Sequence, residues 1–289
     1  MIQLTDIGYV KRLMSAHGIT FQKKFGQNFL INPAVPERIA AECGAKPEDA
    51  ILEIGPGIGT MTQYLCEMYE KVVAVEIDRA LIPILDETLA AYDNVTVIEG
   101  DIMKINLPAL FASHFAGKNV TVCANLPYYI TTPILMLLLE SGLPLDNITV
   151  MIQKEVADRL AAAPGTAEYG AVTAAVQYYA EVDKLFQVSA GNFLPAPKVD
   201  SAVVRMHLYK EKPVKVKEEA LFFRVIRAAF GQRRKTLLNA LSAGMGDFTN
   251  SELAEAIASA GFAENIRGER LSTAEFGHLA DLLFDIKHP

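Results

Sequence analysis

Residues 125–128, Asn-Leu-Pro-Tyr, combine the groups needed to hold and stack a flat amine. The Asn125 amide oxygen and the carbonyl of Leu126 or Pro127 are hydrogen-bond acceptors, and Pro127 lacks the N–H that would donate into the same space. Two acceptors that converge on one point suit an exocyclic amino group. Tyr128 adds an aromatic face on which a heterocycle can stack. A turn with an Asn cap and a core tyrosine uses the same residue types, so both interpretations stand at this point.

Acidic residues follow two other apolar runs. Glu76 lies at the end of the run 71–77, about 20 residues after a glycine-rich stretch, where a carboxylate can accept hydrogen bonds from two ribose hydroxyls. Glu99-Gly100-Asp101 follows the run 95–98. An acid at the carboxyl end of a buried strand is hard to explain by packing. These acids therefore favour a nucleoside site.

The glycine-rich stretch is Gly55-Pro-Gly57-Ile-Gly59, between a predicted strand over 50–54 and a predicted helix over 60–69. Glycines allow the turn to pass close under a ligand, and the start of the helix offers free backbone N–H groups. The spacing departs from the dinucleotide fingerprint, whose third glycine comes one residue later. An ordinary tight turn would also use glycine here.

The elements that must position these residues form an α/β pattern. Predicted strands over 50–54, 71–77, 95–98 and 120–124 deliver their polar residues to the carboxyl edge of one parallel sheet, where open α/β sheets bind ligands. Strands follow over 148–153, 182–188 and 202–208, the last two as an antiparallel edge pair. Helices are predicted over 132–140, 155–163 and 169–180, and a short amphipathic helix within 1–20.

The remainder of the chain predicts a small helical domain. Residues 210–217 are polar with one proline and predict a linker, which places a first domain at 1–209 and a second at 218–289. Helices are expected over 218–230, 234–243, 251–260 and 273–284, the last with Ser272 or Thr273 as N-cap.

Composition predicts a packed, soluble, cytoplasmic protein: 51% of the 289 residues are hydrophobic and 21% are charged. The leucine-rich run 134–139 is too short to span a membrane, and the N-terminus lacks the apolar core of a signal peptide. The widely spaced Cys43, Cys66 and Cys123 fit reduced thiols better than disulfides or a metal site.

The net charge of −7 is unevenly placed. Residues 205–235 contain ten Lys/Arg and three Glu, a local charge of +7 that leaves −14 for the rest of the chain. A solvated linker and helix face would explain such a run. Because binding of a polyanion depends on local potential, this basic segment is also a candidate contact surface.

Six stretches, in this order, resemble the S-adenosylmethionine-dependent ribosomal RNA adenine dimethylases of KsgA type. They are Gly-Gln-Asn-Phe-Leu (26–30), Glu-Ile-Gly-Pro-Gly-Ile-Gly (53–59), Glu76, Gly-Asp (100–101), Asn-Leu-Pro-Tyr (125–128) and Phe-Leu-Pro-Ala-Pro-Lys-Val-Asp-Ser (193–201). Phe-Gly-Gln-Arg-Arg-Lys-Thr (230–236) agrees with the family's small helical C-terminal domain. The resemblance implies a Rossmann-like methyltransferase domain with a mostly parallel seven-stranded sheet whose last strands are antiparallel.

The resemblance also implies roles for individual residues. S-adenosylmethionine, leaving as S-adenosylhomocysteine, would be held by Asn28, Leu30, Gly55, Gly57, Glu76, Ile77, Asp101, Ile102 and Asn125. Glu76 would hold the ribose hydroxyls, and Asp101 would accept from the cofactor's adenine amine. Asn125 with the Leu126 or Pro127 carbonyl would accept from the two N–H bonds of the target amine, while Tyr128 and Phe193 sandwich its base. Such a mechanism needs no strong general base and no metal.

The implied substrate is ribosomal RNA in a small-subunit assembly intermediate, at two adjacent adenosines of a 3′-terminal hairpin of the 16S RNA. The target base must be single-stranded or flipped out. Phosphate contacts are expected from Lys23, Lys24, Arg224, Arg227, Arg233, Arg234 and Lys235, with the chain acting as a monomer away from membranes. Solvent is the plainer partner for any one of these side chains.

Three alternatives stay open. A dimethylase of 23S ribosomal RNA that confers antibiotic resistance would share the fold, although the pI of 5.4 and the full C-terminal domain favour the small-subunit enzyme. A ribosome-assembly factor that binds RNA without catalysis is disfavoured by the intact 125–128 motif. A small-molecule methyltransferase would not need the C-terminal basic cluster.

Overall fold

A computed structural model describes residues 3–19 and 28–288 of the chain, which divides into two compact units. The sheet unit comprises residues 1–157 and 182–208, and the helical unit comprises residues 158–181 and 209–289. The chain therefore leaves the sheet unit, returns to it for one stretch, and leaves it again.

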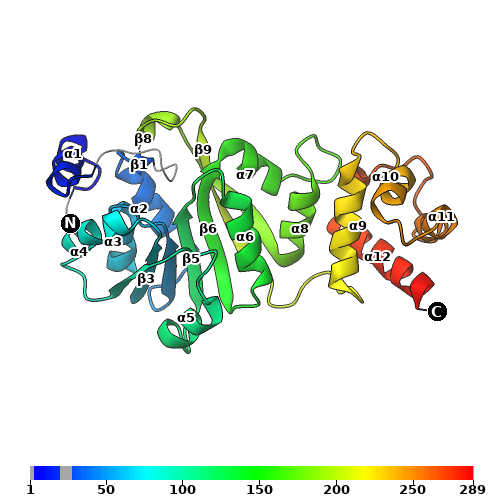
Figure 1. The fold of residues 1–289 in the computed structure, drawn as a ribbon, viewed down its shortest axis with the longest axis horizontal. Coiled ribbons are helices and arrows are strands. Elements are labelled where there is room, and N and C mark those ends of the chain that lie inside the picture. Colours follow the sequence, from blue (N-terminus) through cyan, green and yellow to red (C-terminus); the bar gives the residue numbers. More distant parts are fainter. Residues whose placement is uncertain (1–2, 20–27, 289) are drawn as a thin grey trace. The chain divides into compact units, whose positions relative to one another are not determined.

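The sheet unit is built on a seven-stranded sheet with the strand order β4-β3-β2-β5-β6-β9-β7. Its strands are β2 (Ala50–Ile54), β3 (Lys71–Glu76), β4 (Val95–Glu99), β5 (Val120–Asn125), β6 (Leu145–Gln153), β7 (Ala180–Val188) and β9 (Ser201–Leu208). The pairs from β4 to β6 are parallel, and β9 is antiparallel to β6. In Figure 1, the paired strands β5 and β6 lie side by side. The predicted α/β class and mostly parallel sheet are confirmed.

Strand register aligns the ends of the central strands. Ile54 pairs with Val75 of β3 and with Ala124 of β5. The next residue of each strand, Gly55, Glu76 and Asn125, therefore stands in one row at the carboxyl edge. The chain builds β2, β3 and β4 outward in one direction and then places β5 on the other side of β2. That reversal of strand order marks the ligand-binding crevice of open α/β sheets.

Helices of the sheet unit bury one apolar face each. They are α1 (Ile7–Ala16), α2 (Ala34–Ala41), α3 (Thr60–Met68), α4 (Ile82–Thr88), α5 (Leu107–His114) and α6 (Thr131–Glu140), and α7 (Lys154–Leu160) begins in this unit. Ile39 of α2 and Leu65 of α3 are fully buried in one core cluster with Ile51, Cys123 and Val203 of the sheet. Alternate strand residues thus meet the 3.6-residue stripe of each helix. Helices α4 and α5 lie in regions where no element is predicted.

A second, two-stranded sheet joins β1 (Phe29–Leu30) to β8 (Phe193–Leu194). The strands are antiparallel, with Phe29 opposite Leu194 and Leu30 opposite Phe193. Two stretches of the resemblance that are far apart in sequence, 26–30 and 193–201, are held together by this pairing.

The helical unit has α8 (Ala171–Tyr179), α9 (Glu219–Gly231), α10 (Leu237–Gly244), α11 (Asn250–Ser259) and α12 (Thr273–Lys287). Ser272 is the N-cap of α12, and its side chain accepts a hydrogen bond from the Glu275 backbone N–H. No helix within residues 3–19 or 28–288 has the length and apolar character needed to cross a membrane.

The unit division differs from the predicted boundary at residue 209. Tyr169 and Tyr178 are fully buried in the core of the helical unit, and the Tyr178 ring packs 4.7 Å from that of Phe222. The Tyr169 hydroxyl donates to the Leu271 carbonyl at 2.9 Å. Residues 158–181 belong with the C-terminal helices because their large aromatic side chains complete that core.

Residues 210–217, predicted to be a linker, also pack against the helical unit. Val214 and Val216 contact its core. Lys212 lies 4.6 Å over the Tyr178 ring and pairs with Glu219, and the Lys217 backbone N–H donates to Asp281 at 2.8 Å. Two valines spaced at i and i+2 are the sequence signal that this segment has an apolar side.

Candidate active site

An open cleft lies at the carboxyl edge of the sheet. Eleven of the predicted site residues line it: Asn28, Leu30, Gly55, Gly57, Glu76, Ile77, Asn125, Leu126, Pro127, Tyr128 and Phe193. These residues come from the ends of three parallel strands and from the small β1–β8 sheet. The fold therefore brings most of the predicted site to one place.

The glycine turn between β2 and α3 needs glycine for its backbone conformation. Gly55 and Gly57 have φ values of 72° and 62°, in the left-handed region that side-chain-bearing residues rarely adopt. An added Cβ at Gly55 would meet no atom of the described chain within 4 Å. The turn thus presents bare backbone to open space, which fits a ligand lying directly against it.

Glu76 ends β3 with its side chain only 2% exposed. Its Oε2 accepts from the Gly57 backbone N–H at 3.0 Å, and its Oε1 accepts from the Asp78 N–H at 2.8 Å. Burial raises the pKa of Glu76, and these two backbone N–H groups partly oppose that rise. Each carboxylate oxygen keeps a second lone pair, so the fixed carboxylate can still accept from two ligand hydroxyls.

Asn125 is oriented by a contact across the cleft. Its Nδ2 donates to the Asn28 carbonyl at 3.4 Å, which leaves Oδ1 as the acceptor that can face a ligand. The Pro127 carbonyl already accepts from the Ile130 N–H at 3.2 Å and the Thr131 hydroxyl at 3.1 Å. Of the two predicted carbonyls, that of Leu126 is therefore the better second acceptor.

Two aromatic rings are fixed at the same cleft. The Tyr128 hydroxyl shares a hydrogen bond of 2.9 Å with Ser201 Oγ, at the start of β9. Phe193 is 3% exposed and stands opposite Leu30 in the β1–β8 pair. A flat ring that enters the cleft between them would contact preformed aromatic faces.

Asp101 and Ile102 are not among the residues that line the cleft. Asp101 lies after β4, where its Oδ1 accepts from the Met103 N–H at 3.0 Å and its Oδ2 lies 3.5 Å from Lys104 Nζ. Ile102 is buried, with 6% of its surface exposed. Their contact with a cofactor stays a prediction.

Glu53 is a cleft residue for which the sequence motifs predict no role. It lies one residue before the end of β2, is 1% exposed, and neither carboxyl oxygen has a hydrogen-bond partner within the described residues. Desolvation raises its pKa to about 8, and Glu76 adds to the rise. The Thr62 hydroxyl is near enough to oppose the rise but forms no hydrogen bond. In the sequence, a glutamate inside an otherwise apolar strand is the feature that could have identified Glu53 as a candidate site residue.

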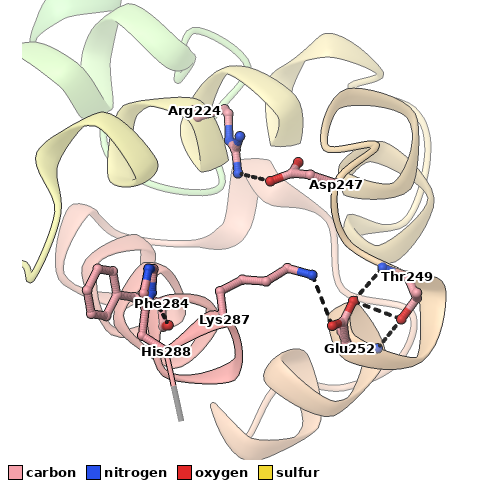
Figure 2. A network of polar contacts seen from close by, with 7 residues as sticks. All are labelled: Arg224, Asp247, Thr249, Glu252, Phe284, Lys287 and His288. Carbon is pink, nitrogen blue, oxygen red and sulfur yellow. Dashed lines mark hydrogen bonds and ion pairs between the residues drawn. The ribbon is translucent and has the colours of Figure 1, made fainter.

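The predicted RNA-contacting cations of the helical unit fall into two groups. Arg224 donates to Asp247 at 2.8 Å, as Figure 2 shows, and Arg233 donates to Glu269 at 2.9 Å and to the Ala167 carbonyl at 2.6 Å. These two have hydrogen-bond partners inside the protein, although Arg233 is itself exposed. Arg227, Arg234 and Lys235 are exposed.

The remaining basic candidates are placed differently. An open groove beside α9 and α10 is lined by Arg224 and Arg227 together with small side chains. The run 233–235 precedes α10, whose N-cap is Thr236, so it does not lie inside the helix start as predicted. Lys23 and Lys24 lie outside the described residues.

Comparison with known proteins agrees with this geometry. The family model described as ribosomal RNA adenine dimethylase matches residues 18–281. A protein of Lachnoclostridium phytofermentans named ribosomal RNA small subunit methyltransferase A is 50% identical over 285 residues, covering 98% of each chain. A protein of the same name from Alkaliphilus metalliredigens is 48% identical, covering 96% of this chain and 97% of its own.

Solved structures show the same fold. The chain is similar to a dimethyladenosine transferase from Plasmodium falciparum, with a TM-score of 0.72 and 27% identity over 86% of this chain and 95% of that one. The 23S rRNA methyltransferase ErmE matches in fold, with a TM-score of 0.68 and 23% identity over 89% of this chain and all of that one. The chain belongs to the ribosomal RNA adenine dimethylase family.

Proposed function

We propose that this protein transfers methyl groups from S-adenosylmethionine to the N6 amines of adenosines in small-subunit ribosomal RNA, forming N6,N6-dimethyladenine. The observation that carries the proposal is the orientation of Asn125, whose Nδ2 is tied to the Asn28 carbonyl so that Oδ1 is left as an acceptor. This oxygen stands in the cleft that also holds Glu76 and the glycine turn. The names of the relatives support the same reaction and substrate.

The cleft fits the cofactor. The open space over Gly55 admits a ligand against bare backbone, and the buried Glu76 carboxylate suits ribose hydroxyls. The unpartnered Glu53 carboxyl supplies a further hydrogen-bonding group inside the cleft. We propose that Asn28, Leu30, Gly55, Gly57, Glu76 and Ile77 hold it, with Asp101 and Ile102 at its adenine. When bound, S-adenosylmethionine supplies an electrophilic methyl group on its sulfonium.

The residues of the 125–128 turn prepare the target amine. The lone pair of adenine N6 is delocalised into the ring, which makes the nitrogen a weak nucleophile. Asn125 Oδ1 and the Leu126 carbonyl accept best from a pyramidal amine, whose lone pair then points away from both acceptors. Bound S-adenosylmethionine would supply the methyl group, with its sulfur keeping the electron pair of the sulfur–carbon bond, while Asn125 Oδ1 and the Leu126 carbonyl would hold the nitrogen that accepts it. The resulting ammonium-like nitrogen loses one N–H proton readily, so no strong base is required.

Positioning accounts for the rest of the rate. Tyr128, braced by Ser201, and Phe193 hold the base between two rings, so that the amine approaches along the axis of the breaking bond. A base inside a duplex could not reach the cleft, so the target is single-stranded or flipped out. We infer that exposed Arg227, Arg234 and Lys235 contact RNA phosphates. The enzyme would act as a monomer in the cytoplasm, where small subunits assemble.

The test is methyl transfer from labelled S-adenosylmethionine to small ribosomal subunits isolated from cells that lack this dimethylation. Purified large subunits and naked RNA serve as parallel substrates, and Asn125→Ala is the inactive control. We expect N6,N6-dimethyladenine in small subunits, and none with the variant.

Each other outcome contradicts part of the proposal. Label only in large-subunit RNA would place the protein in the 23S branch. Binding to small subunits without label would leave an assembly factor, and label in small molecules alone would remove RNA as the substrate.

A further inference from the structure

Exposed large apolar side chains are few, and one of them lines the cleft. Within the described residues, four large ones are exposed: Ile7, Ile77, Tyr129 and Val199. Ile77 lines the cleft itself. Tyr129 is the most exposed of the four at 66%, and it directly follows the cleft residue Tyr128. A single exposed apolar side chain is ordinary, but several at the mouth of one site indicate a binding surface.

The backbone around Tyr129 is fixed by a tight turn. The Ile130 N–H donates to the Pro127 carbonyl at 3.2 Å, and the Thr131 hydroxyl donates to the same oxygen at 3.1 Å. The next residues form α6. The backbone of Tyr129 therefore belongs to a fixed corner that also carries Asn125 and Tyr128, and its exposed ring extends from that corner.

Val199 lies in the loop that carries Phe193, and both ends of this loop are anchored. Asp200 Oδ1 accepts from the Ala190 N–H at 2.9 Å, and the Asp200 carbonyl accepts from the Lys154 N–H at 3.0 Å. Within the loop that runs from Ala190 to Asp200, Lys198 and Val199 are exposed. The loop tip thus presents one cation and one branched apolar side chain on a fixed base.

The Tyr128–Ser201 hydrogen bond joins the turn to this loop. Val199 precedes Ser201 by two residues, which span at most about 7 Å. The bond that braces the base-stacking tyrosine therefore links the residue that precedes Tyr129 to a residue two positions after Val199.

We propose that Tyr129, with Lys198 and Val199, forms a docking platform for the unpaired nucleotide that adjoins the target adenosine in the RNA strand. This inference rests on the proposed function and extends it to the specificity of the same site. A target base that enters the cleft carries its strand neighbours to the cleft mouth. There the Tyr129 ring stacks on the neighbouring base, Val199 contacts its edge, and Lys198 pairs with a phosphate. A stacked neighbour also holds the strand while the target amine is methylated twice.

The test measures initial rates of methyl transfer as the concentration of undermethylated small subunits is varied at saturating S-adenosylmethionine. Tyr129→Ala is compared with Tyr129→Phe, which keeps the ring, and with Ile7→Ala, which removes an exposed apolar side chain outside the cleft lining. Calorimetry gives the dissociation constant of S-adenosylmethionine for each variant. In a parallel arm, a photoreactive phenylalanine derivative replaces Tyr129 and is crosslinked to the subunit.

Loss of one stacked base predicts that Tyr129→Ala raises KM for subunits about 5- to 150-fold, with a smaller change in kcat and unchanged cofactor affinity. Tyr129→Phe restores the KM, and the crosslink falls on RNA beside the methylated adenosine. A wild-type KM in Tyr129→Ala overturns this inference and leaves the proposed function standing. Weakened cofactor binding, or a crosslink to a ribosomal protein, also overturns it. If the wild-type protein transfers no label to any subunit, both the proposed function and this inference are contradicted.

Discussion

The cleft of the sheet unit and the surface of the helical unit differ in how they treat polar side chains. In the cleft, Glu53 is buried with no hydrogen-bond partner within the described residues, and Asn125 uses only its nitrogen in the fold. In the helical unit, Lys287 donates to Glu252 at 3.0 Å and Arg224 Nη2 donates to Asp247, as Figure 2 shows, although Arg224 Nε is buried without a hydrogen-bond partner within the described residues.

The cleft contains polar groups that are still able to bind a ligand, whereas these side chains of the helical unit form hydrogen bonds within the protein. An unpartnered buried carboxyl costs free energy, and a chain retains it only where something else compensates. An exposed ion pair contributes only about 0–1 kcal/mol. A positive side chain with a protein partner is therefore a poorer candidate for RNA contact than its neighbour without one. Each of the following experiments tests this contrast.

The largest effect is expected on the pH dependence of stability through Glu53. Its pKa rises from an ordinary value of 4.5 to about 8 in the fold. Between these values the folded chain keeps a proton that the unfolded chain has lost, so the free energy of unfolding falls as pH rises through this window and levels off above it. Glu53→Gln removes that loss. Urea denaturation at pH 5, 7 and 9 measures the free energy of unfolding of both proteins. Between pH 5 and pH 9, the difference between them should shift in favour of the variant by on the order of 4 kcal/mol.

The groups around Glu53 set the control for that experiment. Glu76 shares its environment and also has a raised pKa, while Cys66 and Cys123 are buried thiols beside it. All three remain in the variant, so their contributions largely cancel in the difference. Glu140→Gln, an exposed glutamate at the end of α6, should follow the wild type. If the free energies of unfolding of the wild type and of Glu53→Gln changed with pH in parallel, the raised pKa of Glu53 would be contradicted.

The next largest effect is expected at Asn125, whose Oδ1 is left as an acceptor for a ligand while Nδ2 bonds the Asn28 carbonyl. Asn125→Ala removes an acceptor whose hydrogen bond to the target amine is strongest in the transition state. We therefore expect kcat to fall about 100- to 1,000-fold. Asn119→Ala is the matched control, because Asn119 precedes the opposite end of β5 and bonds Asp49 rather than facing the cleft. Single-turnover methyl transfer to small subunits measures both. A comparable loss in both variants would mean that the effect is structural.

Glu76 should affect cofactor affinity more than turnover. Glu76→Gln keeps the shape but replaces one acceptor oxygen with an amide nitrogen that faces backbone N–H donors. Loss of a charged hydrogen bond of about 1.5–3 kcal/mol predicts a dissociation constant for S-adenosylmethionine roughly 10- to 150-fold higher. Calorimetry with Asp101→Asn alongside sharpens the result. An equal loss in both variants would place Asp101 in the cofactor site although it is not part of the cleft lining.

The smallest effects separate two adjacent arginines of the helical unit. Arg233→Ala removes hydrogen bonds to Glu269 and to the Thr166 and Ala167 carbonyls, so unfolding should require about 1 kcal/mol less free energy. Arg234→Ala should leave stability unchanged and raise KM for small subunits. Thermal denaturation and subunit titration distinguish them. The reverse pattern would break the rule that paired cations serve the fold.

Much of the sheet and its site could be predicted from sequence because the signals are local. The run 50–54 followed by glycines predicted β2 and its turn with the observed bounds, and the residues of the 125–128 motif do line the cleft, while their role as acceptors stays a prediction. The choice between the Leu126 and Pro127 carbonyls needed the structure, because the Pro127 oxygen is used by contacts that form only when the turn folds.

The domain boundary could not be predicted in the same way. Polar composition over 210–217 resembles a linker, yet Val214 and Val216 are packed. Tyr169 lies in a segment with ordinary helical periodicity, and its partner Leu271 is about a hundred residues away. Long-range burial of this kind leaves little trace in a window of 10 to 18 residues. The same limit applies to Arg233, whose type indicated a phosphate contact although its contacts are internal.

The excursion of residues 158–181 into the helical unit has a consequence for biosynthesis. Tyr169 and Tyr178 leave the ribosome long before Phe222, Leu271 and the rest of their core have been made. During that interval their apolar surface has no permanent cover, even if the strands on either side have begun to pair. The order of translation therefore delays completion of the helical unit until α12 emerges. A chain cut after β9 would keep those tyrosines uncovered permanently, which makes it a substrate for chaperones and proteases.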